Sequence, residues 1–484
     1  PGICAMDSLK LIVFSDSHGD FRALDRLIQK HLGERCVFLH LGDGPLVDIG
    51  GLGIPYGSSG KLFSSVEELS NDRYGKVMTF DLKPYGIYLE KEGDGFYMPL
   101  QTARDLILSY YVCYALYNGE CIILAGGLDD KLSEIYHSAT GTRSEEYAKF
   151  AYNELCFALD YEYGLKEVHG IESFDEYFFN VGLSKALQST DPLKADVALH
   201  KAITLYLDDL HSQFVSPSYQ TDADAFEKEV EGIQGPSNRS FRTTAYKFRD
   251  ARAAAYPDGI PPYEEVGNTA YITFDEFTDP MPDIDYLSEP TEEELTDTIR
   301  LMQYACDRIL RENSPIENVV MDLSMNTGGA INEASYVIGT YLGNGDTNVI
   351  NTMTGAASTA VYKIDTNRDG NFDEQDTLSG KGLNLYCLTS PVSFSCGNLV
   401  PNSFMMSPDV TLVGMTSGGG SCSVHTLSTA GGSIFNISSY QRMSVFKNGS
   451  YYDIDRGADP DLPIRKYEDF YDRQSLTKYI NGIY

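Results

Sequence analysis

The chain has 484 residues, of which 42% are hydrophobic and 22% are charged, and its formal net charge at pH 7 is −33. One hydrophobic core rarely serves a chain of this length, so several domains are expected. The charge excludes nucleic acid and anionic membrane surfaces as partners, because no basic stripe is present to neutralise phosphates. No run of 18 uncharged apolar residues occurs, and the N-terminus lacks a signal-peptide pattern, so no transmembrane segment is expected.

The first 44 residues predict a βαβ segment, because apolar strands at residues 9–14 and 36–41 flank a stretch with helical periodicity. Two carboxylates and an imidazole follow the strand ends, and such groups can hold a divalent ion. They are Asp16, His18 and Asp43. The segment resembles the opening of calcineurin-like metallophosphoesterases, in which these positions are the first metal ligands. That family's later Gly-Asn-His-Asp and Gly-His-x-His blocks are missing, which favours a structural segment over a phosphoesterase site.

Three regions lie between this segment and the last domain. Residues 45–143 predict a small α+β domain without evident chemistry. Residues 144–214 predict a helical bundle, because apolar residues recur there every three to four positions, and this region ends in the motif that contains His211. Residues 215–266 are rich in Gly, Pro, Ser and charged residues and predict a linker or loop.

The last region, residues 267–484, predicts an α/β domain with parallel strand pairs, since strand and helix patterns alternate to its end. Two of its apolar strands end in small and polar residues. One leads into Gly328 and Gly329, and the other leads into Ser395. A hydroxyl just past a strand, opposite glycine backbone amides, is what acyl transfer needs. Ser395 is therefore the candidate nucleophile of a serine hydrolase.

Residues 365–376 insert an acidic loop into this region. Side-chain oxygens stand at loop positions 1, 3, 5, 9 and 12, with glycine at position 6 and an apolar residue at position 8. This spacing gathers oxygens around a hard cation, and it resembles EF-hand and dockerin-type loops with Asp at the last position. The alternative is a solvated acidic turn. The predicted ligands of a structural Ca²⁺ are Asp365, Asn367, Asp369, Asn371, Asp373 and Asp376.

Five motifs in order make residues 145–465 similar to the S41 family of serine peptidases, the C-terminal processing or tail-specific proteases. Leu207-Asp-Asp-Leu-His-Ser212 resembles the family's Leu-x-Asp-x-His-Ser/Thr motif. Val320-Met-Asp-Leu-Ser-Met-Asn-Thr-Gly-Gly329 resembles its Asp-Leu-Arg-x-Asn-x-Gly-Gly strand. Ser393-Phe-Ser-Cys-Gly-Asn398 resembles its Ser-x-Ser-x-x-Glu turn. Residues 413–420 and 457–461 follow where the family has a Val-Gly-x-x-Thr-x-Gly block and a Gly-x-x-Pro-Asp block.

The resemblance implies a crotonase-like ββα core and assigns the central roles. Ser395 becomes the nucleophile, and backbone amides of Cys396 and of Gly328 or Gly329 become the oxyanion hole. Family members with a Ser–Lys dyad carry lysine in the Thr-x-Gly block. This chain has only glycine there, at residues 418–420, so the lysine-dependent mechanism is excluded.

The tricorn-like branch of the family uses a histidine and a late acid instead. By this resemblance His211 is the general base, and the acid is Asp453 or Asp455, where that branch carries Glu. Histidine would take the hydroxyl proton and pass it to the leaving amine, while the carboxylate fixes the imidazole tautomer. His425, expected near the same sheet edge, is a rival base.

Two departures bear on activity: Ser324 replaces the family's Arg, and Asn398 replaces its Glu. The interval between His211 and the strand at Thr269 is short for a PDZ domain, so none is expected. The leading hypothesis is a serine endopeptidase for peptide or protein substrates, secreted or anchored at the cell surface. The alternatives are an inactive S41-like scaffold that binds peptides and, through residues 1–44, a metallophosphoesterase.

Overall fold

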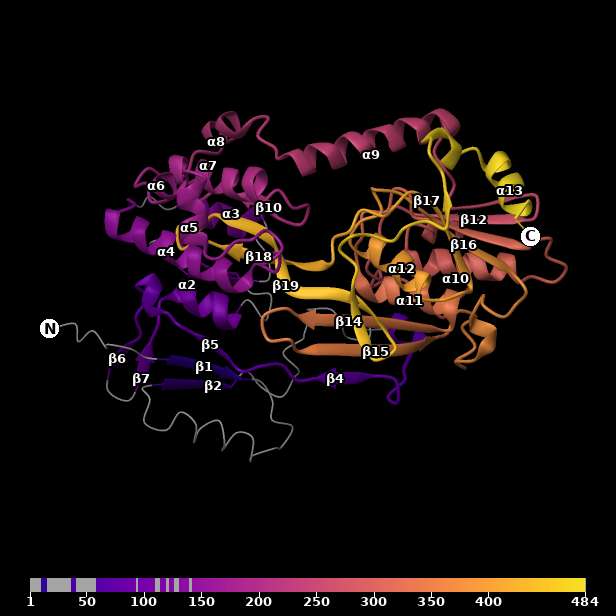
Figure 1. Cartoon of the computed structure of the whole chain (residues 1–484), viewed down its shortest axis with the longest axis horizontal. Helices are drawn as coiled ribbons and strands as arrows, with labels where there is room; N and C mark the ends of the chain where they lie inside the picture. Colours follow the sequence, from indigo (N-terminus) through magenta and orange to yellow (C-terminus); the bar gives the residue numbers. More distant parts are fainter. Residues whose placement is uncertain are drawn as a thin grey trace.

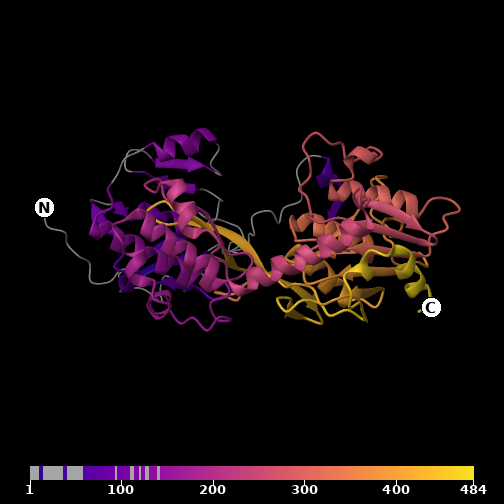
Figure 2. The ribbon, with the colours of Figure 1, turned by 90° about the horizontal axis from the view of Figure 1, so that it is seen from above.

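The computed structural model describes residues 10–14, 36–40, 58–92, 95–108, 114–118, 122–125, 130–138 and 142–483. They form a mainly helical lobe and an α/β lobe, and one long helix and one long strand are among the segments that connect them (Figure 1 and Figure 2). The mixed α/β multidomain architecture expected from the sequence is confirmed. No helix within these ranges is both long and apolar enough to span a bilayer.

The α/β lobe is built on a six-stranded sheet in the order β11-β12-β13-β16-β17-β21. All neighbouring strands are parallel except the first pair, in which β11 runs antiparallel to β12. The predicted parallel strand pairs are therefore confirmed. The six strands are β11 (Tyr263–Val266), β12 (Thr269–Thr273), β13 (Asn318–Asp322), β16 (Asn384–Thr389), β17 (Val410–Gly414) and β21 (Leu462–Pro463).

Helices cover both faces of this sheet, as parallel sheets require. Successive residues of a strand point to opposite faces, so Val319 and Met321 pack on one group of helices and Val320 packs on the other. The first group is α10 (Thr298–Ile309), α11 (Ile331–Leu342) and α12 (Cys396–Met405). The second group is α9 (Pro236–Ala255) and α13 (Arg473–Asn481).

The helical lobe packs its apolar side chains on one end of a second sheet, where Leu427 and Phe435 join its core. Its helices are α4 (Glu145–Glu162), α5 (Phe174–Asn180), α6 (Ser184–Leu187) and α7 (Pro192–His200), followed by a π-helical segment, Lys201–Leu207. α7 starts with a proline after Asp191, whose side chain accepts from the Lys194 N–H and caps the helix.

The second sheet extends from one lobe to the other through the 14-residue strand β19 (Ile434–Lys447). The beginning of β19 pairs with β10 (Gln213–Ser216) and β18 (Cys422–Ser428). Its later residues pair with β14 (Asn344–Asn351) and β20 (Ser450–Asp453). The remaining strands are β15 (Ala357–Ile364), β3 (Phe63–Ser65) and β4 (Asn71–Arg73). β19 is thus one continuous strand that both lobes share.

The N-terminal region contributes short strands and helices at the side of the helical lobe (Figure 1). β1 (Lys10–Phe14) and β2 (Cys36–His40) are parallel, and β5 (Met78–Phe80) runs antiparallel to β1. Asp16, His18 and Asp43, the predicted phosphoesterase ligands, lie outside the described residues. The other elements are β6 (Glu90–Glu92), β7 (Gly95–Tyr97), α2 (Leu100–Ala103), β8 (Tyr114–Tyr117), β9 (Ile122–Ala125) and α3 (Asp130–His137).

The stretch predicted as a linker or loop, residues 215–266, is largely regular instead, and this prediction is wrong. It contains α8 (Ala223–Val230), the 20-residue helix α9 and strand β11. In α9 the apolar residues Phe241, Ala245 and Phe248 recur at helical spacing and pack against the sheet side of the α/β lobe. The many Ser, Thr and Arg residues between them lie on the other sides of the helix. Their number hides the helical periodicity in the sequence.

Candidate active site

Ser395 stands in the turn between β16 and α12. Its backbone has φ 56° and ψ −122°, a conformation that is rare for non-glycine residues and that concentrates at functional sites. Two neighbouring loops impose it. The Ser395 N–H donates to the Gly419 carbonyl at 3.0 Å, and the Phe394 N–H donates to the Asn326 carbonyl at 3.0 Å.

The serine hydroxyls of this turn differ in their partners. Ser393 Oγ donates to the Leu323 carbonyl at 2.7 Å, and Ser390 Oγ donates to the Ser324 carbonyl at 2.5 Å. Both of these serines are buried. Ser395 is half-buried, and within the described ranges its hydroxyl makes no hydrogen bond. Of the three hydroxyls, only that of Ser395 is available for chemistry.

Gly328 and Gly329 follow β13 and pass beside Ser395. Their φ angles are 109° and 124°, in a region that favours glycine. A Cβ on Gly328 would lie 2.6 Å from Ser395 Cβ and 3.0 Å from its Oγ. The Gly328 N–H donates to Asn326 Oδ1 at 2.9 Å. The N–H groups of Gly329 and Cys396 have no acceptor in the described part of the chain, so they remain free to bind an oxyanion.

Glu333 lies in the first turn of α11, four residues after Gly329, and is buried. Burial raises the pKa of its carboxyl to about 8. Its charge would act on the neighbouring Cys396 thiol, whose pKa burial raises to about 12. Because Glu333 carries its proton at pH 7, it places no negative charge beside the candidate oxyanion hole.

Asp209 fixes the turn that carries His211. Its carboxylate accepts from the N–H of His211 at 3.1 Å and from the N–H of Ser212 at 2.9 Å. It also accepts from the Ser438 hydroxyl on β19 at 2.7 Å and from the Tyr163 hydroxyl at 2.9 Å. Both hydroxyl partners belong to the helical lobe or its sheet, so this lobe presents the histidine.

The His211 ring packs against the ring of Phe394, the residue before Ser395, with centroids 4.7 Å apart. Burial lowers the pKa of His211 below its ordinary value, and the negative charges of Asp209 and Asp455 partly oppose this effect. The imidazole is therefore neutral at pH 7, as a general base must be. No hydrogen bond joins its ring to Ser395 Oγ among the described residues; catalytic hydrogen bonds are often long before substrate binds.

The two candidate acids have different partners. Asp453 is exposed, and both of its carboxylate oxygens accept from Arg442 Nη2, at 2.8 and 2.9 Å. Asp455 is half-buried, and its Oδ1 accepts from the N–H and the hydroxyl of Ser421, each at 3.0 Å. Of these two acids, Asp455 is the one whose charge acts on His211. The charge of Asp455 on His211, together with the pairing of Asp453 with Arg442, favours Asp455 over Asp453 as the candidate acid.

The glycine run at residues 418–420 has no room for the side chain that the Ser–Lys members carry. A Cβ on Gly419 would lie 2.2 Å from the carbonyl oxygen of Asp455. A Cβ on Gly420 would lie 2.5 Å from the ring of Phe394. The space is filled by the acid's backbone and by the ring that supports His211, which is a physical reason for the absence of lysine.

Asn398, which replaces the family's Glu, is fully buried and ties α12 to the turn that carries Asp455. Its Nδ2 donates to the Ile454 carbonyl at 2.9 Å, and its Oδ1 accepts from the Ser417 hydroxyl at 2.7 Å. The Ser417 hydroxyl accepts in turn from the Ala458 N–H at 2.7 Å. This departure from the family pattern keeps a connection between nucleophile and acid.

Ser324, which replaces the family's Arg, shares a hydrogen bond of 3.1 Å with the Tyr471 hydroxyl. A buried arginine does reach this strand end from elsewhere: Arg473 of α13 donates to Asp322 Oδ2 at 2.6 Å. Local sequence reasoning missed Arg473 because 151 positions separate it from Asp322. Asp322 ends an apolar strand that the sequence predicts to be buried, and a buried carboxylate needs a cationic partner. This requirement is the signal that points to an arginine elsewhere in the chain.

His425, the rival base, lies on β18 and has its own partner. Its Nδ1 is 3.2 Å from Glu162 Oε2 at the end of α4. This pair belongs to the helical lobe. His211 is the histidine that contacts the Ser395 turn.

Helix α9 contacts the neighbours of both the base and the nucleophile. At its start, the Asp208 carboxylate accepts from the N–H groups of Ser237 at 2.6 Å and of Asn238 at 3.1 Å. Asp208 stands three residues before His211. One turn further along α9, the ring of Phe241 packs against that of Phe394, with centroids 5.9 Å apart.

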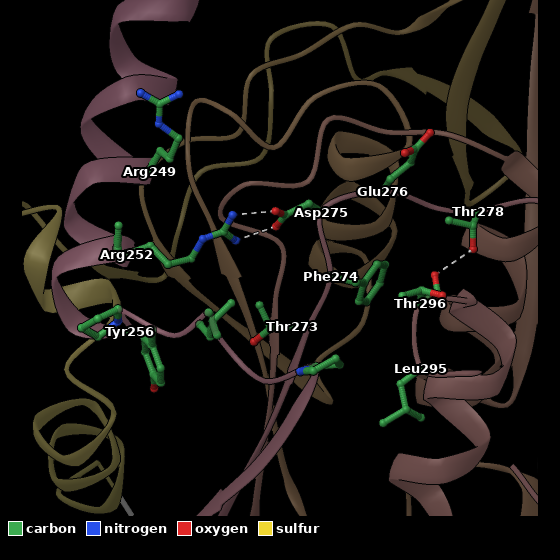
Figure 3. A pocket seen from close by; sticks show the side chains of 15 residues that line it. Arg249, Arg252, Tyr256, Thr273, Phe274, Asp275, Glu276, Thr278, Leu295 and Thr296 are labelled. Carbon is green, nitrogen blue, oxygen red and sulfur yellow. Dashed lines mark hydrogen bonds and ion pairs between the residues drawn. The ribbon is translucent and has the colours of Figure 1, made fainter. Parts of the chain in front are cut away.

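The far end of α9 reaches the loop beside the glycine pair. Arg252 donates through both terminal nitrogens to Asp275, at 2.7 and 2.6 Å (Figure 3). The Asp275 carbonyl accepts from the Thr327 N–H at 3.0 Å, directly before Gly328. A pocket of about 560 Å³ opens here between α9 and the loop, and its wall includes Phe274.

The acidic loop has the local hydrogen bonds of a tight calcium-type turn. Asp365 accepts from the N–H groups of Arg368 and Gly370, at 2.6 and 2.9 Å, and Gly370 has φ 78°. Asp376 accepts from the Thr366 N–H at 2.9 Å and from the Asp373 N–H at 3.0 Å. No group of three or more acidic, His or Cys side chains is gathered for a metal within the described chain. The calcium site stays a prediction.

None of the curated proteins compared matches the chain. Among similar solved structures, a putative peptidase from Parabacteroides merdae has 14% identity and a TM-score of 0.46, over 71% of this chain and 97% of that one. A lipoprotein from Streptococcus agalactiae has 14% identity and a TM-score of 0.41, over 72% and 98%. The photosystem II D1 C-terminal processing protease has 13% identity and a TM-score of 0.41, over 68% and 96%.

The family model of peptidase family S41 matches residues 268–464. This range contains Ser395, the glycine pair and both candidate acids, and it begins downstream of His211. The recognition made from the sequence motifs is confirmed over this part of the chain, where residues 268–464 match the model of peptidase family S41.

Proposed function

We propose that the chain is a serine peptidase that cleaves peptides or unfolded proteins through an acyl-enzyme. Ser395 is the nucleophile, His211 is the general base and Asp455 is the orienting acid. One observation carries this proposal: a free serine hydroxyl on a strained turn stands beside a glycine backbone, with a neutral histidine packed on the preceding residue. The match of residues 268–464 to the model of peptidase family S41 supports peptide or protein substrates.

In the proposed reaction His211 transfers one proton in each of two steps. His211 accepts the proton of Ser395 Oγ as Oγ bonds to the scissile carbonyl carbon. The N–H groups of Gly329 and Cys396 stabilise the negative carbonyl oxygen. His211 gives the proton to the leaving amine as the C–N bond breaks, which leaves an acyl-enzyme. Water then attacks while His211 takes its proton, and Ser395 leaves with that proton when the ester bond breaks.

A fluorophosphonate probe tests the nucleophile, because it forms a covalent bond only with an activated serine. We expect the wild-type protein to be labelled and the Ser395→Ala variant to be unlabelled. Ser393→Ala is the matched control, since its hydroxyl belongs to the same turn but donates to a carbonyl. Circular dichroism establishes that each variant folds. Labelling that survives in Ser395→Ala would refute the assignment.

An inactive scaffold that binds peptides is the second candidate. Two observations favour it: no hydrogen bond joins His211 to Ser395 Oγ among the described residues, and Ser324 and Asn398 replace the family's charged residues. A folded protein that binds unfolded polypeptide, resists the probe and cleaves nothing would establish this function instead.

The pocket beside α9 is our candidate for the side chain of a bound substrate. It combines apolar wall residues such as Phe274 and Leu295 with the Arg252–Asp275 ion pair (Figure 3). Filling it by Leu295→Trp should raise KM and leave kcat unchanged, and an unchanged KM would exclude the pocket as a substrate site.

The location outside the cytoplasm, implied by the family resemblance, is tested by cell fractionation of the tagged full-length protein.

A further inference from the structure

Asp455 is held on one side only. Its Oδ1 accepts both the N–H and the hydroxyl of Ser421, at 3.0 Å each, and Oδ2 has no partner among the described residues. Ser421 is completely buried, so its hydroxyl cannot turn to water. The Ser421 carbonyl accepts from the Met443 N–H at 2.7 Å, which anchors this residue to β19. One carboxylate oxygen is thus immobilised, and the other is free to act on a neighbour.

Arg442 holds Ser421 from the far side. Its Nε donates to Ser421 Oγ at 3.1 Å, so that hydroxyl accepts from Arg442 and donates to Asp455. The strand register places Arg442 opposite Cys422, next to Ser421. The arginine side chain is 15% exposed, and its planar guanidinium can serve two partners at once.

Asp453 closes the network. Its carboxylate accepts from Arg442 Nη2, and its Oδ1 also accepts from the Asp455 N–H at 2.9 Å. The network is therefore a ring that begins and ends at Asp455 and contains the two acids that the sequence could not tell apart. An exposed ion pair alone contributes little to stability. In this ring, however, the Arg442–Asp453 pair also holds the guanidinium that donates to Ser421.

We infer that Ser421 and Arg442 are positioning residues for the catalytic acid: Asp453 fixes Arg442, Arg442 fixes Ser421, and Ser421 aims the Asp455 carboxylate at His211. This inference rests on the proposed function and deepens it. The two candidate acids then have different tasks. Asp455 acts on the base, and Asp453 acts on the arginine that holds the acid's support in place.

The first test measures the pKa of His211 by NMR in protein labelled with ¹³C-histidine, with the resonance assigned by His211→Gln. Asp455→Ala removes a negative charge near the ring, so the pKa of His211 should fall. Ser421→Ala keeps every charge but frees the carboxylate, and we expect a shift in the same direction. Ser423→Ala is the matched control, because Ser423 lies two residues further along, on β18, and its hydroxyl bonds to Ser439. An unmoved pKa in folded Ser421→Ala would overturn the inference.

The second test measures kcat. Ser421→Ala should lower kcat about 10- to 100-fold, as expected from the loss of one hydrogen bond to a charged group. In the Asp455→Ala background the same change should lower kcat less than about twofold, because a positioning residue acts only through its target. Equal effects in both backgrounds would show that Ser421 supports the fold alone and would overturn the inference.

A charge-preserving variant tests the arginine. Arg442→Lys keeps the positive charge but loses the planar donors that reach both Ser421 and Asp453, so kcat should fall several-fold with KM unchanged. Arg311→Lys, in an ion pair with Glu265, is the control and should keep full activity. Full activity of Arg442→Lys would contradict the role of Arg442. If wild-type protein lacks activity, the proposed function fails, and the NMR shift still decides whether Ser421 positions Asp455.

Discussion

The ring of His211 rests on the ring of Phe394, and Phe394 is bonded directly to Ser395. The base comes from the helical lobe and the nucleophile comes from the α/β lobe, so this contact is where the two halves of the candidate site meet. Phe394 is 8% exposed, and the glycine run at residues 418–420 leaves the space that its ring fills. Packing thus places the histidine next to the nucleophile turn.

Removal of the Phe394 ring should therefore separate the base from the nucleophile. We expect Phe394→Ala to destabilise the protein by about 3 kcal/mol, the usual range for loss of a buried aromatic ring, and to abolish cleavage. Phe404→Ala is the control, because Phe404 is buried on α12 and stacks on Tyr341, away from His211. It should lower Tm comparably and retain kcat below the melting transition. Equal kcat values for the two variants would contradict a role for Phe394 in placing the base.

The lowered pKa of His211 predicts the acid limb of the rate profile. Only neutral imidazole can accept the Ser395 proton, so kcat/KM should rise with pH through a pKa below 6.5 and then level off. Asp455→Asn removes a charge that favours the protonated ring, so its limb should lie at still lower pH. The measurement is kcat/KM against pH with a quenched fluorescent peptide. A wild-type limb above pH 7 would contradict His211, with its lowered pKa, as the base.

Glu333 predicts an alkaline limb. Its carboxyl is neutral below its pKa of about 8, and Asp279 and Asp297 help to keep it so. Above that pH its negative charge should oppose the oxyanion near Cys396, so kcat should decline. Glu333→Gln should remove this decline. Glu154→Gln, at a buried glutamate of the helical lobe, should leave the profile unchanged. The same decline in Glu333→Gln would assign the limb to another group.

Gly419 should tolerate no side chain. Gly419→Ala places a methyl group 2.2 Å from the Asp455 carbonyl at a φ of 79°, so Asp455 must shift, and kcat should fall with Tm. Gly380→Ala is the matched control, since Gly380 has φ 76° and open space around it. It should cost only the conformational strain of about 1 kcal/mol and keep kcat. If both variants behave alike, the contact with Asp455 is unimportant.

The calcium prediction is tested by removal of the metal. EDTA should lower the Tm of wild-type protein, and added Ca²⁺ should restore it, because a cation bound only to the folded state stabilises that state. Asp365→Ala should abolish this difference. Asp409→Ala, at an exposed aspartate bonded to Ser379, should preserve it. Identical wild-type melting curves in Ca²⁺ and EDTA would show that the loop is a solvated acidic turn.

Local patterns were sufficient to predict the parts of the site that depend on neighbours in sequence. The two strands that lead to Gly328 and Ser395 are recognisable from sequence because their apolar runs give way to small and polar residues. The parallel sheet that brings them together was predicted as a fold class, and the register Asp322↔Leu388 now shows how the two ends meet.

The remaining parts depend on residues that are distant in sequence. Asp453 and Asp455 have the same side chain two positions apart, and only Arg442 across the sheet and Ser421 in the adjoining loop distinguish them. Arg473 reaches Asp322 from the last helix. α9 was missed because its apolar positions are few and the rest of its surface is polar.

Helix α9 fixes the spacing between two parts of the candidate active site. Its first turn is capped by Asp208, beside the base, and Arg252 near its end binds Asp275, beside the glycine loop. An α-helix advances about 1.5 Å and rotates about 100° with each residue. Deletion of one residue between these contacts would turn Arg252 away from Asp275 while every reacting group stayed intact. α9 supplies no catalytic atom. Even so, we expect catalysis to depend on the number of residues in this helix.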